Sequence, residues 1–438
     1  MSAMIDKARQ EMEETSQERE TRSAGGFRQT EKNLPTDLGS RRNIPLVDNV
    51  TSYFGGFNRL AKKIDSTQEI VWLLDNTAYR PVHVYPHKPQ PWQAEFVVAF
   101  FKKHVSKDLT SAVADIAGKL GLGPEDKGLM TIENRLQPFV RTIAPARFVE
   151  VKFRSGEIQK LGPGGRSAVS QELLLNLGEH NDGDTISISA APPEASPHGP
   201  MITNFAEPEG WLVISGTLHV ILSPPPTPFR EEHRPSSYTL PLDIDDSIKI
   251  TGSLVPMAIL RSTFVDEPTP IAGMPELYAH VKSVLNPTWY YLSASPYNLY
   301  PFLRSFLHVH YPPGPIILRD ASWQDLGGFL ASLTQGTEAY KTSRMDKIHG
   351  WLPRRKVLCV GDSTQSDPEA YGNIARKYKG WVKAVFIRKV TDVAEMKGSD
   401  KNKDERFEKA FKDVPREIWK VFEDPKELYE ALDALKGT

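Results

Sequence analysis

The chain has 438 residues, 39% of them hydrophobic, and a formal net charge of -1. This length and composition predict a globular protein of roughly two or three domains with a sizeable core. The near balance of 54 Lys and Arg residues against 55 Asp and Glu residues gives no global reason to expect a nucleic-acid partner, so none is predicted.

The cysteine content and the absence of long apolar runs indicate the cellular compartment in which the protein is expected. A single cysteine, Cys359, excludes an intrachain disulfide, and the apolar run "VLCVG" around it predicts an inert buried thiol. No segment approaches the roughly 20 apolar residues of a membrane span, and the first residues lack the apolar core of a secretory signal. We therefore expect a cytoplasmic protein that is peripheral to membranes at most.

The first half of the chain changes composition twice. Residues 1–43 are rich in Glu, Arg, Gln and Ser and poor in aromatic residues, which predicts a disordered tail. Residues 44–130 are expected to form a helical region, because "QAEFVVAFFKKHV" places apolar residues on one helical face and "TSAVADIAGKLGLG" ends in glycines. Residues 131–205 alternate in "RFVEVKF" and "TISISA" around turn sequences, which predicts a small β-rich unit.

The second half reads as an α/β fold. Over residues 206–395, short apolar runs such as "WYYLSAS", "PIILRD", "VLCVGDS" and "AVFIRKV" alternate with helical stretches. That alternation is typical of a parallel sheet with crossover helices. Residues 396–438 are highly charged and are interpreted as a solvated helical end.

Ligands bind at the carboxyl ends of the strands in such a sheet, so the residues that follow each apolar run are the candidates for chemistry. These are Asp243 and Asp245 in "DIDDS", Ser293, the helical Lys341 or Lys347, and Asp362 and Asp367 in "GDSTQSD". The set suits phosphoryl transfer to water through an aspartyl phosphate. Asp243 would attack phosphorus, and Asp245 would protonate the leaving oxygen and later activate water.

The remaining candidates suit the charge that develops in this reaction. Mg²⁺ prefers a few hard oxygen ligands, which the carboxylates of Asp243 and Asp362 and one backbone carbonyl could supply; Asp245 and Asp367 complete the predicted magnesium site. Ser293 can donate a hydrogen bond to a phosphoryl oxygen, and a lysine can neutralise the transferred group. Lys341 is favoured over Lys347.

Several residues have plainer interpretations. Asp246 is interpreted as structural, since the mechanism assigns it no task. Asp367 could either cap the helix that begins with Pro368 or orient the metal ligands. In "WLLDNTAY", Asp75 imitates an aspartate at a strand end but lacks a second carboxylate two residues later, so a turn is favoured. His83 and His87 in "HVYPHKP" are interpreted as loop residues among prolines.

These motifs together resemble the haloacid dehalogenase superfamily of phosphatases. "DIDDS" is similar to its first motif, with Ser247 in place of the usual Thr, Ser293 to its second and "GDSTQSD" to its fourth. The wider set "WLLDNTAYRP", "PWQAEF", "FVDEPTPIAGMPELY", "SASPYNLYPFL" and "GDSTQSDPEAY" resembles the fungal phosphatidate phosphatase family associated with cortical actin patches. The resemblance implies Mg²⁺-dependent hydrolysis of phosphatidate to diacylglycerol and phosphate, by a haloacid dehalogenase-like sheet.

The spacing of the motifs leaves no room for a large cap domain, so an open site is expected. An open site favours a phosphate presented on something large, such as a phosphatidate-containing membrane surface or a protein. A protein phosphatase with the same aspartates is therefore one alternative. The other is a weakly active interaction protein of the cortical actin machinery, since "PPTPFR", Pro225 to Arg230, fits the pattern that SH3 domains bind.

The region before Asp243 is unusual. "GWLVIS", Gly210 to Ser215, has the apolar character of a buried parallel strand and, in the family it resembles, leads directly into the first motif. Here residues 216–242, with six prolines, stand between them. Either they form a surface loop, with "YTLPL" replacing "WLVIS" as the strand that presents Asp243, or they are translated intron sequence. We favour the second interpretation, because removing them joins "WLVIS" to "DIDDS".

Overall fold

The structure is a computed structural model that describes residues 61–82, 90–105, 108–123, 126, 128–164, 168–175, 177–216, 220–221, 264–319, 337–391, 396 and 398–437. All of these belong to one compact unit, Val50–Thr438. Several predictions fall outside the described residues: the tail 1–43, the loop histidines, the "PPTPFR" segment, "YTLPL" and the aspartates and serine of "DIDDS".

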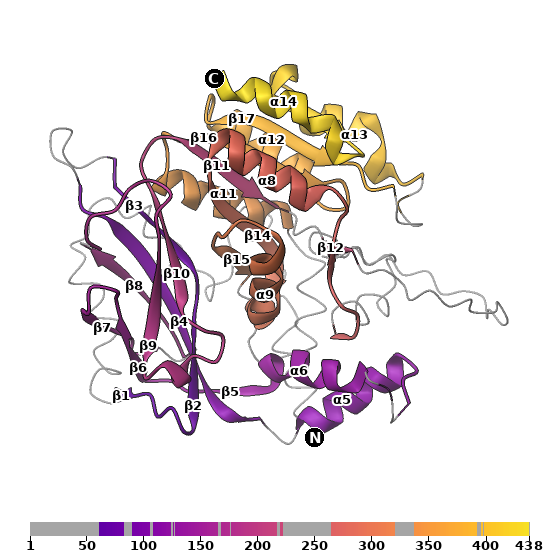
Figure 1. The fold of residues 1–438 in the computed structure, drawn as a ribbon. Helices are drawn as coiled ribbons and strands as arrows, with labels where there is room; N and C mark the ends of the chain where they lie inside the picture. The colour runs from indigo at the N-terminus through magenta and orange to yellow at the C-terminus, as the bar shows by residue number, and fades with distance from the viewer. Residues whose placement is uncertain are drawn as a thin grey trace, which may run out of the picture. The chain divides into compact units, whose positions relative to one another are not determined.

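A β-rich body occupies the first half of this unit (Figure 1). Its longest path of paired strands runs β1-β6-β9-β10-β3-β4-β2, with β5 and β8 paired to β4 and β7 paired to β6. The strands are β1 (Lys62–Lys63), β2 (Glu69–Leu73), β3 (Asn76–Tyr79), β4 (Gln93–Val105), β5 (Arg141–Ile143), β6 (Arg147–Lys152), β7 (Ile158–Leu161), β8 (Val169–Leu175), β9 (Thr185–Ala191) and β10 (Met201–Ala206). The predicted strands "RFVEVKF" and "TISISA" are β6 and β9.

The prediction of a helix over "QAEFVVAFFKKHV" is wrong, because this segment is strand β4. Alternate side chains such as Phe96 and Phe100 enter one core, while Ala99 and Phe101 enter a second core on the opposite face. A strand buried on both faces gives a continuous apolar run whose periodicity does not separate it from a buried helix. The β-rich body therefore begins near residue 62, well before the predicted boundary at 131.

The helical part of this region is a pair of helices inserted between strands β4 and β5. They are α5 (Asp108–Lys119) and α6 (Gly128–Val140). The glycine prediction is confirmed at the end of α5, where Gly121 has a φ of 67°, a left-handed conformation that suits a residue without a Cβ. Within the described part of residues 44–140, the predicted helical layer thus reduces to these two helices.

The second half contains a six-stranded sheet in the order β15-β14-β11-β16-β17-β18, and every neighbouring pair is parallel. The strands are β11 (Trp211–Ser215), β14 (Thr288–Pro296), β15 (Ile316–Arg319), β16 (Lys356–Asp362), β17 (Val382–Arg388) and β18 (Trp419–Phe422). The prediction of an α/β fold with a parallel sheet is confirmed. The short strands β12 (Val220–Ile221) and β13 (Thr269–Pro270) pair separately.

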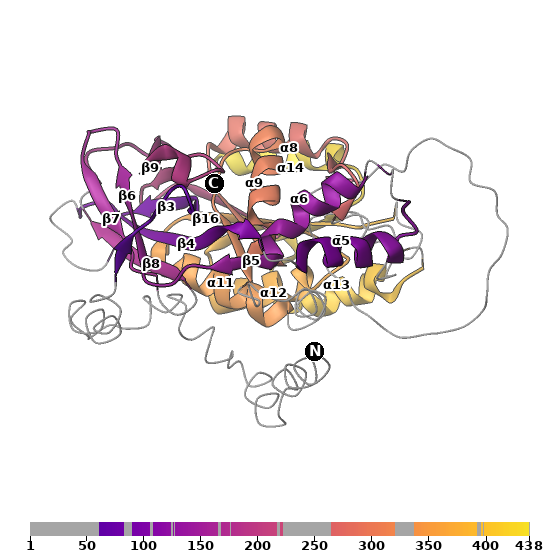
Figure 2. The same cartoon turned by 90° about the horizontal axis from the view of Figure 1, so that it is seen from below.

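Helices cover both faces of this sheet, as Figure 2 shows. On one face lie α8 (Met274–Leu285), α9 (Tyr300–His310) and α14 (Tyr429–Ala434), which share a core with the side chains of alternate strand residues. On the other lie α11 (Thr337–Trp351), α12 (Asp367–Lys377) and α13 (Asp404–Ala410), which pack in a second core. Cys359 is buried in this second core, as predicted, and burial raises the pKa of its thiol.

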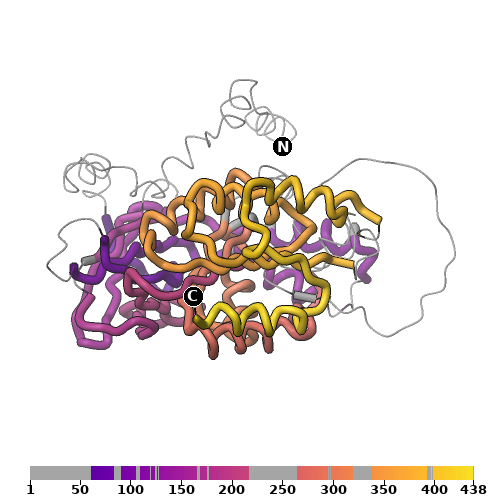
Figure 3. The backbone as a smooth tube through the Cα atoms, turned by 90° about the horizontal axis from the view of Figure 1, so that it is seen from above, coloured from indigo at the N-terminus to yellow at the C-terminus, as the bar shows by residue number. Residues whose placement is uncertain are grey.

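The interpretation of residues 396–438 as a helical end is confirmed by helices α13 and α14, but the expectation that this end is solvated is wrong. Strand β18 forms the edge of the parallel sheet beside β17, and Leu428 and Leu432 are buried. In Figure 3 the yellow C-terminal segment returns over the sheet, where α14 packs beside α8. A four-residue strand, "WKVF", is too short to stand out within so charged a sequence.

A buried ion pair joins the β-rich body to helix α9. Asp75 lies in the turn between β2 and β3, as predicted, and its carboxylate accepts hydrogen bonds from the Arg304 guanidinium at 2.7 and 2.9 Å. The backbone N–H of Ile202 donates to the same carboxylate at 2.7 Å, and Arg304 also donates to the carbonyl oxygens of His198 and Pro200. Asp75 is thus a structural residue.

Candidate active site

Strand β11 lies at the point where the strand order of the parallel sheet reverses. In chain order the six strands are arranged 3-2-1-4-5-6, so the chain leaves β11 toward β14 on one side and later continues through β16 on the other. A crevice for ligands forms at the carboxyl ends of the strands at such a point. A ligand site is therefore expected at the edge formed by the carboxyl ends of β11, β14 and β16.

The register of the three strands brings predicted residues to this edge. Ser215, the last residue of β11, is level with Tyr291 on β14 and with Val360 on β16. Ser293 and Asp362 are each two residues further along their strands and so project on the same face of the sheet as these partners. They flank the continuation of β11 from its two sides.

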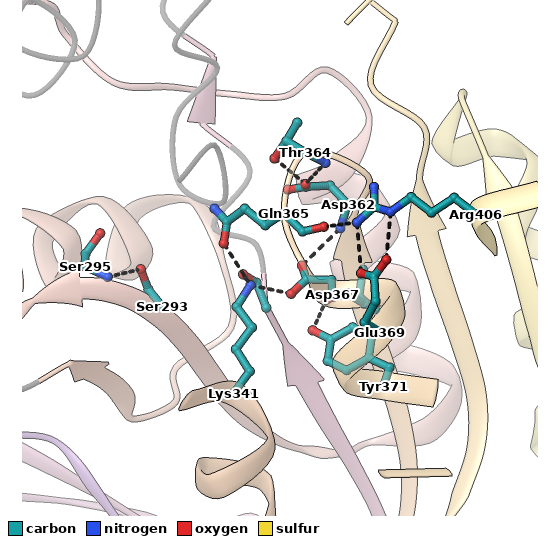
Figure 4. Close-up of polar contacts among 12 residues, drawn as sticks. Ser293, Ser295, Lys341, Asp362, Thr364, Gln365, Asp367, Glu369, Tyr371 and Arg406 are labelled. Atoms are coloured by element: carbon teal, nitrogen blue, oxygen red, sulfur yellow. Dashed lines mark hydrogen bonds and ion pairs between the residues drawn. The ribbon is translucent and has the colours of Figure 1, made fainter. Parts of the chain in front are cut away.

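Strand β11 ends against a lysine. Gly216 follows Ser215, and its N–H donates to the Val360 carbonyl at 2.8 Å, which extends the pairing with β16 by one residue. The Lys341 ammonium on α11 is completely buried and lies 3.4 Å from the Gly216 carbonyl oxygen. It also donates to Gln365 Oε1 at 3.2 Å and forms an ion pair with Asp367 (Figure 4).

Asp367 is the first residue of helix α12, and Ser366 occupies the N-cap position. Its carboxylate reaches Lys341 and accepts a hydrogen bond from the backbone N–H of Asp362 at 3.2 Å. These contacts fit a role in orienting the neighbouring Asp362 better than a role as a helix cap. Burial raises the pKa of Asp367, the nearby Asp362 carboxylate adds to the rise, and Lys341 opposes it.

Two glycines make room for this carboxylate. A Cβ on Gly216 would lie 2.8 and 2.9 Å from the Asp367 oxygens and would collide with the Tyr371 hydroxyl. A Cβ on Gly361 would lie 2.5 Å from the same carboxylate. The end of β11 is therefore packed directly against Asp367 and Tyr371, with no space for a side chain at position 216.

The loop between β16 and α12 is held from two directions. Within it, Asp362 Oδ1 accepts hydrogen bonds from Thr364 N at 2.7 Å and Thr364 Oγ1 at 2.6 Å. From the C-terminal segment, Arg406 on α13 donates to the carbonyls of Ser363 and Gln365. Lys401 donates to the carbonyl oxygen of Thr364 at 2.8 Å. These contacts fix the backbone that carries Asp362 and Asp367.

The structure thus brings Ser293, Lys341, Asp362 and Asp367 to one edge of the sheet. Ser293 is buried, and its Oγ accepts a hydrogen bond from Ser295 N at 3.1 Å, which leaves its O–H able to donate. Lys347 lies elsewhere, paired with Glu95 of the β-rich body at 2.6 Å. Asp243 and Asp245 lie outside the described residues, so the structure does not place them.

Sequence reasoning missed four contributors to this edge: Gln365, Tyr371, Lys401 and Arg406. Arg406 and Lys401 lie in the segment interpreted as a solvated end, where lysines and arginines are too frequent for any one of them to be distinguished. Gln365 stands inside "GDSTQSD", and its place between Asp362 at the end of β16 and Asp367 at the start of α12 was a usable signal. Tyr371 follows Asp367 by four residues, so the two side chains lie on one face of α12.

The residues present were compared with what a magnesium ion requires. Asp362 and Asp367 offer carboxylate oxygens, the donors that Mg²⁺ prefers. Among the described residues, no group of three or more His, Cys, Asp or Glu side chains is arranged to hold a metal ion. The carboxylates of Asp362 and Asp367 therefore fit the donor preference of Mg²⁺.

Comparison with known proteins finds a similarity over part of this half of the molecule. Residues 240–389 match the catalytic domain of phosphatidate phosphatase APP1. This segment is therefore similar to the APP1 catalytic domain. The match includes Ser293, Lys341, Asp362 and Asp367, and begins three residues before Asp243, so that strand β11 lies outside it.

Two yeast proteins resemble the chain over a similar length. Phosphatidate phosphatase APP1 of Saccharomyces cerevisiae is 29% identical over 163 residues, which are 35% of this chain and 27% of that protein. The uncharacterized protein C29B5.04c of Schizosaccharomyces pombe is 28% identical over 153 residues, 34% of this chain and 24% of that protein. The chain thus covers about a quarter of the length of these curated relatives.

No helix within the described ranges is both long enough and apolar enough to cross a membrane.

Proposed function

We propose that the protein is a phosphatidate phosphatase that hydrolyses phosphatidate to diacylglycerol and phosphate. The observation that carries the proposal is the meeting of Lys341, Asp362 and Asp367 at the end of β11, within the segment that matches the APP1 catalytic domain. Fixed charges at the carboxyl edge of a parallel sheet suit a phosphoryl group, since its transfer depends on positioning and charge stabilisation. We assign this half to a haloacid dehalogenase-like fold with an open site.

In the proposed reaction, Asp243 is the nucleophile. Its carboxylate oxygen bonds to phosphorus as the bond from phosphorus to the glycerol oxygen breaks, and the leaving oxygen takes a proton from Asp245. Asp245, now a carboxylate, then takes a proton from water as that water attacks phosphorus, which breaks the bond to Asp243 and releases phosphate. The i, i+2 spacing of the two residues suits this division, because such residues project on one side of an extended segment.

The described residues would act on the phosphoryl group. Ser293 donates a hydrogen bond to one of its oxygens, and Lys341 supplies a positive charge that its carboxylate and amide partners hold in place. Asp243, Asp245, Asp362 and Asp367 form the proposed magnesium site. Bound Mg²⁺ would supply charge that neutralises the phosphate oxygens.

The proposed substrate is presented on a membrane surface, which suits a peripheral protein with an open site. Recruitment to cortical actin patches by SH3 domains that bind "PPTPFR" is a further part of the proposal, and it rests on the sequence pattern alone. A protein phosphatase remains the main alternative activity.

The test is phosphate release from phosphatidate-containing micelles, with and without Mg²⁺, by the full chain and by Asp243→Asn and Asp245→Asn. We expect Mg²⁺-dependent release by the wild type and none by either variant, with unchanged circular dichroism. Release from phosphopeptides but not from micelles would replace this proposal with a protein phosphatase. Near wild-type activity of either variant would show that the nucleophile or the acid is misassigned.

A further inference from the structure

Gln365 lies at the carboxyl edge of the sheet, and only one end of its side-chain amide, the oxygen, is hydrogen-bonded. It lies in the loop between β16 and α12 and is 8% exposed. Its Oε1 accepts a hydrogen bond from Lys341 at 3.2 Å, while its Nε2 is buried without a hydrogen-bond partner among the described residues.

The orientation of this amide follows from the chemistry of Lys341. An ammonium group only donates hydrogen bonds, so the atom of Gln365 that faces it must be the oxygen. The NH₂ group is therefore directed elsewhere as a pair of donors. A rotation of the amide that exchanged its two ends would place donor against donor beside a buried cation.

Among the described residues, the Lys341 ammonium faces three acceptors: Gly216 O at 3.4 Å, Gln365 Oε1 at 3.2 Å and the Asp367 carboxylate. In Figure 4 the amide end of Gln365 extends past Lys341 in the direction of Ser293 and Ser295. The NH₂ group of Gln365 thus places further hydrogen-bond donors between Lys341 and the strand that carries Ser293.

The backbone of Gln365 is fixed while its amide nitrogen is unpaired. Arg406 donates to the Gln365 carbonyl oxygen and also pairs with Glu369 at 2.8 Å, which anchors the loop to α13. A buried donor without an acceptor is unfavourable, because it has lost the hydrogen bond that it would make with water. Such groups are rare in folded proteins and call for an explanation, such as a ligand that supplies the missing acceptor. A phosphoryl oxygen is an acceptor of the required kind.

We propose that Gln365 Nε2 donates a hydrogen bond to an oxygen of the substrate's phosphoryl group, so that Gln365 is a phosphate-binding residue. The proposal deepens the phosphatidate phosphatase function and rests on it for the identity of the substrate. The same amide links substrate and Lys341, because its oxygen holds the ammonium while its nitrogen holds the phosphate. Inorganic phosphate, the product of the reaction, presents the same acceptors.

The test compares Gln365→Glu and Gln365→Met with wild type. Glu keeps an acceptor for Lys341 but replaces the donor with negative charge, whereas Met removes both hydrogen bonds and adds no charge. Gln159→Glu on β7 is the matched control, since it makes the same charge change in the β-rich body. Two quantities are measured: the rise in melting temperature caused by inorganic phosphate, and KM and kcat for phosphatidate in micelles.

We expect Gln365→Glu to weaken inorganic phosphate binding and raise KM by about tenfold or more, as the loss of a hydrogen bond to a charged group implies. Gln365→Met should weaken both by a smaller factor, and Gln159→Glu should change neither. If Gln365→Glu does not fold, as judged by melting without phosphate, Gln365→Met decides the question.

Unchanged phosphate binding in Gln365→Glu, or no effect of phosphate on wild-type melting, would overturn the inference. If the wild type binds inorganic phosphate through Gln365 but releases none from phosphatidate, the proposed function fails and the phosphate-binding role stands. If the wild type hydrolyses phosphatidate and both Gln365 variants keep its KM, the function stands and the inference fails.

Discussion

Two buried aspartates of this protein show how different a structural carboxylate is from a candidate functional one. Asp75 and Asp367 are 7% and 0% exposed, and each pairs with a cation that a helix supplies. Burial alone would raise the pKa of Asp75, but hydrogen bonds from His308 and Arg304 outweigh it and lower the pKa below its ordinary value. The pKa of Asp367 is instead raised, by burial and by Asp362.

The difference lies in how completely each carboxylate is satisfied. Asp75 receives Arg304 on both oxygens and a backbone N–H as well, an arrangement that favours the charged form. Asp367 lies beside a second carboxylate, an arrangement that costs free energy unless a further cation or a proton enters. Perturbed acids of the second kind are concentrated at functional sites.

The largest effect on stability is expected at Asp75. Asp75→Asn leaves the buried Arg304 without its counter-charge, which should lower the free energy of unfolding by about 3–5 kcal/mol. Activity per folded molecule should change little. Denaturant unfolding measures the effect, with Asp346→Asn as the matched control, because Asp346 pairs with Lys377 at the surface and should contribute under about 1 kcal/mol. Equal losses of unfolding free energy in Asp75→Asn and Asp346→Asn would contradict the prediction that the buried pair contributes more than the surface pair.

Asp362, the carboxylate beside Asp367, offers a test of the candidate functional acids. Asp362→Ala removes a proposed metal ligand rather than the reacting group, so activity should fall by about tenfold or more and recover in part at high Mg²⁺. The measurement is a magnesium titration of phosphate release. Full wild-type activity in the presence of EDTA would contradict the metal-dependent scheme altogether.

The segment 216–242 offers a test of how the site is assembled. β11 pairs with β14 and β16 on its two sides, whereas "YTLPL" lies outside the described residues. The hypothesis of translated intron sequence remains. Deleting these residues would put Asp243 at the position of Gly216, next to Lys341, and should raise both melting temperature and activity.

The deletion would place the Asp243 side chain against Tyr371. The new side chain would collide with the Tyr371 hydroxyl, which now donates to the Val360 carbonyl at 3.1 Å. Tyr371→Phe should therefore stabilise the shortened chain and destabilise the full-length one, as thermal melting would show. Equal or better stability and activity of the full-length protein relative to both shortened forms would refute the hypothesis.

The smallest effect is the acid dependence of Asp75. Because its pKa is lower in the folded than in the unfolded state, the unfolded state binds more protons between the two values, and stability rises with pH there. The contribution is complete above the ordinary pKa of about 3.9 and is lost as pH falls through the folded value. Unfolding free energies measured from pH 5 downward should fall more steeply for wild type than for Asp75→Asn; parallel curves would contradict this.

The sequence predicted the parallel sheet and the strand-end positions of Ser293 and Asp362 because both depend on local patterns. Short apolar runs followed by polar residues identify strand ends, and strand ends of a parallel sheet meet at one edge. The error at β4 has a physical origin, since burial on both faces removed the periodicity that would have shown this segment as a strand. Arg406 acts through contacts between segments distant in sequence, which local patterns do not encode, whereas the place of Gln365 inside "GDSTQSD" was a usable signal.

The central claim is that phosphoryl transfer takes place around Lys341 and Asp367. Phosphate release from phosphatidate by Lys341→Met and Lys347→Met tests it most directly, because both lysines lie on α11 and each pairs with a buried acid. Asp367 should tolerate the loss of Lys341 by taking up a proton, since its pKa is already raised. We predict that folded Lys341→Met releases no phosphate while Lys347→Met keeps most of its activity. Substantial activity in Lys341→Met, or equal losses in the two variants, would contradict the account.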